Sequence, residues 1–210
     1  MFDGYRFILA SKSPRRRELL AGLDLKFEVE TGPESKEGFN EDIPHSQVPE
    51  YLAKHKSITF HRPLEPGEVL ITADTLVFGQ QEKLEKGILS EVTLQKCAIL
   101  GKPTDREDAF RMLSLLSDNT HYVLTGVSIR TLDELRSFTA VTEVSFKKLS
   151  TKEISYYIDN YAPYDKAGAY GVQEWIGHIG ITSISGSYYN VMGLPVQRLY
   201  TELCDLCGKK

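Results

Sequence analysis

The stretch RFILASKSPRRRELL, residues 6–20, has the pattern of a buried strand, a tight turn and a helix. Phe7–Ala10 is a short apolar run of the kind found in strands that are covered on both faces. Ser13 is a favourable N-cap, and Pro14 suits the first helical position, where its missing N–H is not needed. The stretch therefore predicts a buried strand that leads directly into a helix.

Three arginines, Arg15, Arg16 and Arg17, occupy the first turn of the predicted helix, where cations oppose the helix dipole. Their presence is explained if an anion binds there to free N–H groups, serine hydroxyls and guanidinium groups. Arg15 and Arg16 lie one turn before the apolar Leu19 and Leu20, so both are expected to point into a pocket, whereas Arg17 points elsewhere. The alternative is a solvated basic helix start that pairs with nearby carboxylates, and the local pattern does not separate the two.

The composition is that of an ordinary folded protein. The chain has 210 residues, of which 41% are hydrophobic and 26% are charged, and its net charge is −4. This charge argues against a general nucleic-acid binder and makes the basic cluster a local site. No apolar run approaches the length of a membrane span or a signal-peptide core, and the sparse cysteines suit a reducing compartment. We therefore expect a cytoplasmic protein with neither nucleic-acid nor membrane partners.

The stretch VLITADTLVF, residues 69–78, predicts a second buried strand that contains one carboxylate, Asp74. A carboxylate in such a run is costly unless it is paired, hydrogen-bonded or bound to a metal. One interpretation is a carboxylate that accepts a proton or binds a metal, and the other is an Asp at a strand end that accepts backbone N–H bonds. The apolar run resumes directly after Thr75, which favours a functional role.

The remaining chain alternates further predicted strands and helices. Strands are expected at residues 25–29, 121–130 and 137–146, and helices at 48–55, 104–116, 150–158 and 195–206. Capping boxes are predicted from Thr104 to Glu107 and from Ser150 to Glu153. Residues 79–100 are interpreted as a hairpin-like excursion beside the Asp74 strand.

The stretch from Asn160 to Pro195 is rich in glycine and aromatic residues and has little regular period. Asp165, Lys166 and Gln173 are polar groups within it. Long irregular loops are usually functional, and glycines allow the backbone to approach a ligand closely. We therefore expect part of a binding site here.

Several motifs occur in an order that resembles the Maf family of nucleoside triphosphate pyrophosphatases. They are LASKSPRR (9–16), ADT (73–75), GKP (101–103), DKAGAYGVQ (165–173) and GSYYNVMGLP (186–195). The resemblance covers almost the whole chain and implies one Maf-like domain over residues 1–210. It implies a mixed α/β fold similar to that of the inosine triphosphate pyrophosphatases, with an elongated central sheet, flanking helices and two lobes around a cleft.

The resemblance also implies an activity, which is hydrolysis of a nucleoside triphosphate between its α and β phosphates to the monophosphate and pyrophosphate. It implies a divalent metal, Mg²⁺ or Mn²⁺, and a homodimer. The residues that would bind the triphosphate are Ser11, Arg15, Arg16, Lys56 and Lys102. Asp74 would be the proton acceptor for the attacking water and a metal ligand. Members often carry an Asp–Glu pair after the second strand, and here only Glu34 and Glu37 are candidates for that metal contact.

Base preference is implied by three positions. Pyrimidine-selective members carry Arg, Thr and Gln where this chain has Arg15, Thr75 and Gln173, and the Gln amide offers both a donor and an acceptor to a uracil or thymine edge. The expected substrates are therefore dTTP and UTP, with modified pyrimidine nucleotides as a further class. Two alternatives stay open: a non-enzymatic nucleotide-binding regulator of cell division, and a purine pyrophosphatase for ITP or XTP.

Overall fold

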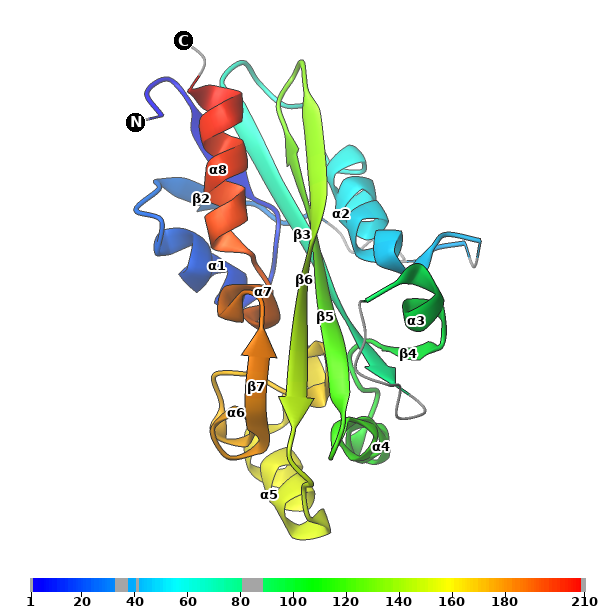
Figure 1. Ribbon diagram of the computed structural model, residues 1–210. Helices are drawn as coiled ribbons and strands as arrows, with labels where there is room; N and C mark the ends of the chain where they lie inside the picture. Colours follow the sequence, from blue (N-terminus) through cyan, green and yellow to red (C-terminus); the bar gives the residue numbers. More distant parts are fainter. Residues whose placement is uncertain (1, 33–37, 41, 81–88, 209–210) are drawn as a thin grey trace.

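The computed structural model describes residues 2–32, 38–40, 42–80 and 89–208, which form an elongated α/β protein around one sheet (Figure 1). The strands are β1 (Arg6–Leu9), β2 (Phe27–Val29), β3 (Glu68–Gln80), β4 (Cys97–Leu100), β5 (Thr120–Arg130), β6 (Leu135–Phe146) and β7 (Ile181–Ser185). The α-helices are α1 (Pro14–Ala21), α2 (Val48–Ile58), α3 (Glu91–Gln95), α4 (Arg106–Leu116), α5 (Thr151–Tyr161), α6 (Trp175–Gly180), α7 (Tyr188–Met192) and α8 (Val196–Cys207). Short 3-10 helices are η1 (His45–Gln47), η2 (Pro163–Asp165) and η3 (Ala167–Ala169).

The sheet is mixed, which confirms the expected fold class. Its order is β2-β1-β3-β5-β6-β7, and β4 also pairs with β3. β1 runs parallel to β2 and β3, whereas β4, β5, β6 and β7 each pair antiparallel with their neighbours. The long strands β3, β5 and β6 extend along the molecule and give it its elongated shape (Figure 1).

One edge of β3 is shared by two short strands that do not meet. β1 pairs with β3 as far as Ile71, and β4 pairs with it from Val77 onwards. Among the described residues, no strand pairs with this edge over residues 72–76, although β5 pairs with the other edge throughout. Asp74 therefore lies in a break of the sheet, which explains how an apolar strand can present a carboxylate.

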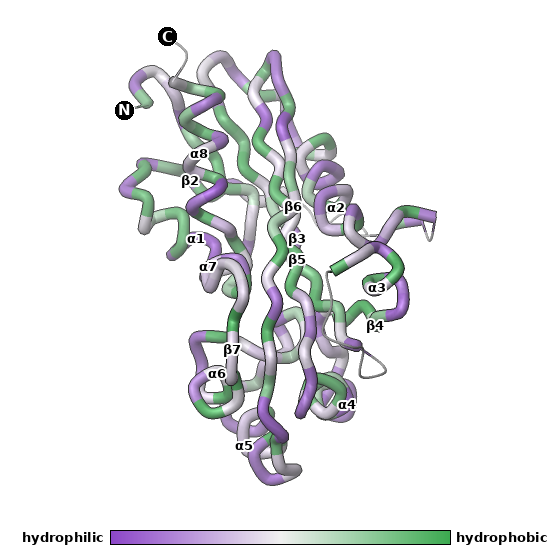
Figure 2. The backbone as a smooth tube through the Cα atoms, in the orientation of Figure 1, coloured by the Kyte–Doolittle hydropathy of each residue, from purple (hydrophilic) through white to green (hydrophobic). Residues whose placement is uncertain are grey.

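Two hydrophobic cores lie at opposite ends of one face of the sheet. Helices α1 and α8 cover the core near β1, and α4, α5 and α6 cover the other. Helices α2 and α3 cover the opposite face with a third apolar cluster. The strands carry most of the apolar stretches in Figure 2, as expected for elements covered on both faces. The two cores on one face correspond to the predicted two lobes.

Helix α2 lies very close to the sheet because β5 has a glycine beneath it. A Cβ on Gly126 would lie 2.2 Å from the carbonyl carbon and oxygen of Pro49. The buried Thr72 of β3 also donates its hydroxyl to the Ala53 carbonyl of α2 at 2.7 Å. These contacts fix the position of α2, which carries Lys56.

Two sequence-based expectations were wrong in detail. Helix α4 is capped by Asp105, whose carboxylate accepts from the Asp108 N–H, so the N-cap lies one residue after Thr104 and the predicted Thr104–Glu107 box is not formed. The stretch 160–195 is not one irregular loop, because it contains α6, β7 and α7 as well as two 3-10 turns. The predicted capping box of Ser150 and Glu153 is confirmed.

The excursion after β3 returns to the sheet. Its described part, residues 89–100, contains α3 and then β4, which pairs antiparallel with the end of β3. None of the helices in the described part of the chain is both long and apolar enough to traverse a bilayer.

Candidate active site

The break in the sheet opens into a cavity of about 670 Å³ between the two lobes. Its walls come from the start of α1, the middle of β3, the end of α2, the loop after β4 and the segment from η2 to α6. All eight predicted catalytic and substrate-binding residues line it: Ser11, Arg15, Arg16, Lys56, Asp74, Thr75, Lys102 and Gln173. The residues that the motifs predicted for the site therefore lie around one cavity in the structure.

The charge of the cavity wall is predominantly positive. Its described lining residues include six cations and two carboxylates: Lys12, Arg15, Arg16, Lys56, Lys102 and Lys166, against Asp74 and Asp165. Such an excess suits a ligand that carries several negative charges, because cations at a partly enclosed wall are screened less than cations on an open surface.

The N-terminal turn of α1 forms one side of the cavity. Ser13 caps the helix by accepting from the Arg16 N–H, as the sequence predicted, and no acidic residue occupies the first turn. The buried Ser11 hydroxyl accepts from the Ser13 N–H at 3.3 Å. The helix start thus presents hydroxyls, N–H groups and guanidinium groups together, which is the composition of an anion site.

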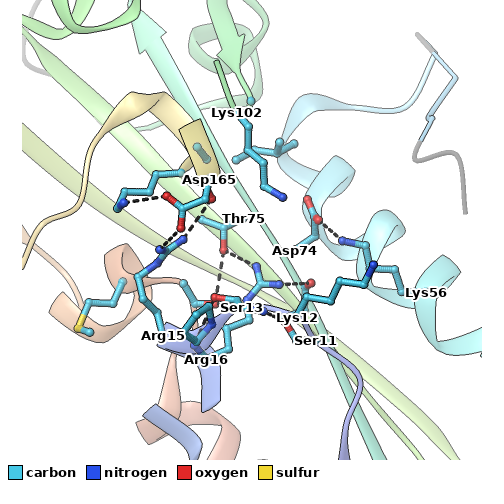
Figure 3. A pocket seen from close by; sticks show the side chains of 18 of the residues that line it. Ser11, Lys12, Ser13, Arg15, Arg16, Lys56, Asp74, Thr75, Lys102 and Asp165 are labelled. Atoms are coloured by element: carbon cyan, nitrogen blue, oxygen red, sulfur yellow. Dashed lines mark hydrogen bonds and ion pairs between the residues drawn. The ribbon is translucent and has the colours of Figure 1, made fainter. Parts of the chain in front are cut away.

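Arg15 and Arg16 both reach the cavity but differ in their partners (Figure 3). Arg15 Nη1 lies 2.6 Å from Asp165 Oδ2, and its Nη2 donates to the Asp165 carbonyl at 3.2 Å. Arg16 donates to the Ala73 carbonyl at 2.8 Å, to the Thr75 hydroxyl at 3.0 Å and to the Gly193 carbonyl at 2.8 Å. Arg16 therefore joins α1, β3 and the end of α7, whereas Arg15 lies against a carboxylate that is half exposed.

Asp74 and Thr75 point to opposite faces of β3 because side chains alternate along a strand. Asp74 is 7% exposed, and its Oδ1 accepts from Lys56 Nζ of α2 at 2.5 Å. Thr75 faces α1 and α7, and its hydroxyl lies 2.9 Å from that of Thr125 on β5. One cavity reaches both side chains only because the sheet is broken at this position.

Lys102 follows β4 and projects into the cavity from the side opposite α1 (Figure 3). Its ammonium forms no hydrogen bond or ion pair with any residue that the structure describes. The preceding Gly101 carbonyl accepts from the Gly168 N–H at 3.0 Å, which ties this loop to η3. Lys102 is therefore a cation that is available to a ligand.

Gln173 also lines the cavity. Its Oε1 is buried, and no described residue donates a hydrogen bond to it. A buried amide oxygen without a donor costs about 1–3 kcal/mol. A ligand N–H would remove that cost if the amide turned its oxygen towards the cavity.

Lys166 lines the cavity but received no role from the sequence. Its ammonium lies 2.7 Å from Asp165 Oδ1 and 3.1 Å from Glu174 Oε1, and the side chain is 9% exposed. Burial alone would raise the pKa of Asp165, but hydrogen bonds from Lys166 and Arg15 lower it to about 2. The signal that could have identified Lys166 was its place beside Asp165 in the glycine-rich stretch.

The described residues of the cavity offer few ligands to a divalent cation. The described residues contain no cluster of three or more His, Cys, Asp or Glu side chains able to hold a metal. Mg²⁺ commonly binds one or two carboxylates together with substrate phosphates, so Asp74 alone is compatible with a metal that arrives with a nucleotide. Glu34 and Glu37 lie outside the described residues, and their metal contact stays a prediction.

A known sequence family matches this chain. A profile described as "Maf-like protein" matches residues 6–206. The chain belongs to the Maf family. It is 50% identical over 204 residues to a protein of Phocaeicola vulgatus and 48% identical over 204 residues to one of Bacteroides thetaiotaomicron, and each match covers 97% of both chains. Both of these Maf relatives are named dTTP/UTP pyrophosphatase.

A solved structure was also matched to this Maf-family chain. It is the nucleoside-triphosphatase, dITP/XTP pyrophosphatase, of Mycobacterium abscessus, with a TM-score of 0.39 and 16% sequence identity. The match covers 69% of this chain and 75% of that one.

Proposed function

We propose that this protein is a nucleoside triphosphate pyrophosphatase that hydrolyses dTTP and UTP to the monophosphate and pyrophosphate. The observation that carries the proposal is a single cavity with six cations, one buried carboxylate in a sheet break and an unpaired amide oxygen. The names of relatives that are 48% and 50% identical over nearly the full length support the same substrates.

Different residues of the site would bind the substrate, accept the proton and hold the site in place. Arg15, Lys56 and Lys102 neutralise the triphosphate, and the Ser11 hydroxyl binds a phosphate oxygen. Asp74 accepts the proton of the attacking water, while Lys56 holds its carboxylate in place. Arg16 keeps α1 against β3, so that the phosphate-binding turn faces Asp74.

The proposal includes a divalent cation, Mg²⁺ or Mn²⁺, held by Asp74 and substrate phosphates. When bound, the cation supplies further neutralisation of phosphate charge. The proposal also includes a cytoplasmic location, which the three free cysteines and a nucleotide substrate support, and a homodimer, which light scattering would test.

Gln173 is proposed to select the base. Its amide can pair with the N–H and carbonyl groups of uracil or thymine once its buried Oε1, which lacks a described donor, turns towards the ligand. A site built to hydrogen-bond one group rejects a ligand that lacks it, because a buried polar atom is then left unpaired.

The experiment is pyrophosphate release from dTTP, UTP, CTP, ITP and a methylated GTP, with Mg²⁺, Mn²⁺ or chelator. We expect turnover of dTTP and UTP that needs the metal and falls at least about 100-fold in Asp74→Asn. Asp24→Asn makes the same chemical change at an exposed position and should keep full activity. No turnover of any nucleotide would contradict the proposal and favour a nucleotide-binding regulator.

A second arm tests the base assignment. Gln173→Glu replaces the amide with a group that only accepts, so the preference for dTTP and UTP should fall. Gln197→Glu makes the same change on the exposed side of α8 and is the matched control. Wild-type turnover of ITP in place of pyrimidines would instead favour a purine pyrophosphatase.

A further inference from the structure

A buried tyrosine behind the cavity holds both ends of the turn that carries Gln173. Tyr157 of α5 is 0% exposed, and its hydroxyl accepts from the Gly171 N–H at 3.0 Å. The same hydroxyl donates to Glu174 Oε2, and the Glu174 N–H donates to the Gly171 carbonyl at 3.0 Å. Gln173 lies between these two anchored residues, so its backbone position is fixed from behind.

Glu174 continues this network towards the phosphate side. Its Oε1 lies 3.1 Å from the ammonium of Lys166, which lies 2.7 Å from Asp165 Oδ1. Asp165 in turn holds Arg15 at 2.6 Å through its other oxygen. A continuous set of hydrogen bonds and ion pairs thus joins Tyr157 to the arginine at the start of α1.

The environment suits a permanent donor rather than a reacting group. Burial raises the pKa of Tyr157, and the neighbouring Glu174 raises it further, so the hydroxyl keeps its proton. The backbone at Gly171 lies so close that a Cβ there would be 2.8 Å from Glu174 Cδ. Neither Tyr157 nor Glu174 lines the cavity, so neither is in a position to touch a bound nucleotide.

We propose that Tyr157 and Glu174 are positioning residues, which fix Gln173 for base selection and hold Lys166 and Arg15 for the triphosphate. If the pair were purely structural, its replacement would change stability and leave the ligand preference unaltered. The assignment rests on the proposed function, since it names what supports the base and phosphate groups of that site.

The experiment removes one hydroxyl at a time from α5. In Tyr157→Phe, we expect the dissociation constant for dTTP to rise, and the preference for dTTP over CTP to fall about tenfold, the effect of losing one well-made hydrogen bond. Tyr156→Phe is the matched control, because Tyr156 is half exposed on the same helix and stacks edge-on against Trp175 through its ring. It should keep the wild-type preference.

A second variant separates the two arms of the network. Glu174→Gln keeps an oxygen that can accept from Tyr157 but loses the charge that holds Lys166. We expect it to weaken the binding of dTTP, CTP and inorganic pyrophosphate alike, with the base preference retained. Calorimetric binding is measured beside turnover, and circular dichroism confirms folding.

The outcomes distinguish the two proposals. Wild-type affinity and preference in both variants, with only a lower Tm, would overturn the positioning role and leave a structural one. Selective binding of dTTP without turnover would refute the pyrophosphatase proposal. The variants would then still decide whether the network positions Gln173.

Discussion

The close approach between Gly126 of β5 and the first turn of α2 predicts a large effect of one added methyl group. In Gly126→Ala, the Cβ would lie 2.2 Å from the carbonyl carbon and oxygen of Pro49 and 2.3 Å from the Glu50 nitrogen. Ordinary contacts of a Cβ begin near 3.4 Å, so α2 must move away by about 1 Å. The obstacle is backbone, which cannot rotate aside as a side chain can.

The expected cost follows from this displacement. Overpacking of a close-packed interior costs about 1–3 kcal/mol, and a backbone obstacle favours the upper value. For a domain of this size, about 3 kcal/mol lowers Tm by roughly 6–12 °C. The same movement would separate Lys56 Nζ of α2 from Asp74 Oδ1, which lie 2.5 Å apart in the wild-type protein. A misplacement of about 1 Å near reacting groups reduces turnover on the order of 100-fold.

The assay combines calorimetric Tm with pyrophosphate release, and Gly38→Ala is the control. A Cβ on Gly38 would meet nothing within 4 Å, so this variant should match the wild type. A Tm of Gly126→Ala within about 1 °C of the wild-type value would refute the argument, because α2 would then not be held by the close approach. A lower Tm with unchanged turnover would refute the step that connects α2 to Asp74 through Lys56.

Two buried ionisable groups predict a loss of stability in acid, His121 over the upper part of the pH range and Glu68 over the lower part. Burial lowers the pKa of His121 to about 3, so the folded state stays neutral while the unfolded chain binds a proton below about pH 6.5. Stability should therefore fall by about 2 kcal/mol between pH 7.5 and 5 in urea unfolding, and less in His121→Gln. Hydrogen bonds from Arg62 lower the pKa of Glu68 to about 2, so its contribution is present above about pH 4.5 and is lost towards pH 2. Glu68→Gln should cost about 3 kcal/mol at pH 7 and show a smaller loss over that acid range.

The sequence predicted the regular elements well where local signals were strong. β3 and β5 have clear apolar runs, and the Ser13 cap of α1 and the Ser150–Glu153 box each combine a clear pattern with a local hydrogen bond. The motif residues also converged on one cavity, because each motif supplied chemistry as well as spacing. At the two helix caps local physics is sufficient, since few distant contacts are needed to decide the conformation.

The stretch 160–195 was harder to predict for a physical reason. α6 contains two glycines, and β7 is a five-residue edge strand, ITSIS, in which three residues are polar. Such short elements have little intrinsic stability and depend on tertiary partners. The buried Asn190 of α7 supplies one such contact, because its amide donates to the Val123 and Ala140 carbonyls of β5 and β6. No local sequence pattern predicts these two hydrogen bonds.

The break in the sheet explains why two adjacent arginines have different tasks. Where β1 ends and β4 has not begun, the Ala73 carbonyl of β3 points to an edge on which no described strand pairs. An unpaired buried carbonyl is costly, and the guanidinium of Arg16 satisfies it at 2.8 Å. Arg16 therefore takes the place of a neighbouring strand and leaves room for a ligand beside Asp74. A β1 that ran three residues further, or a β4 that began earlier, would have covered that space. Arg15, one residue earlier on α1, has only Asp165 as its described partner and stays available to phosphate. The sheet break thus creates both the need for Arg16 and the space in which Arg15 meets a ligand.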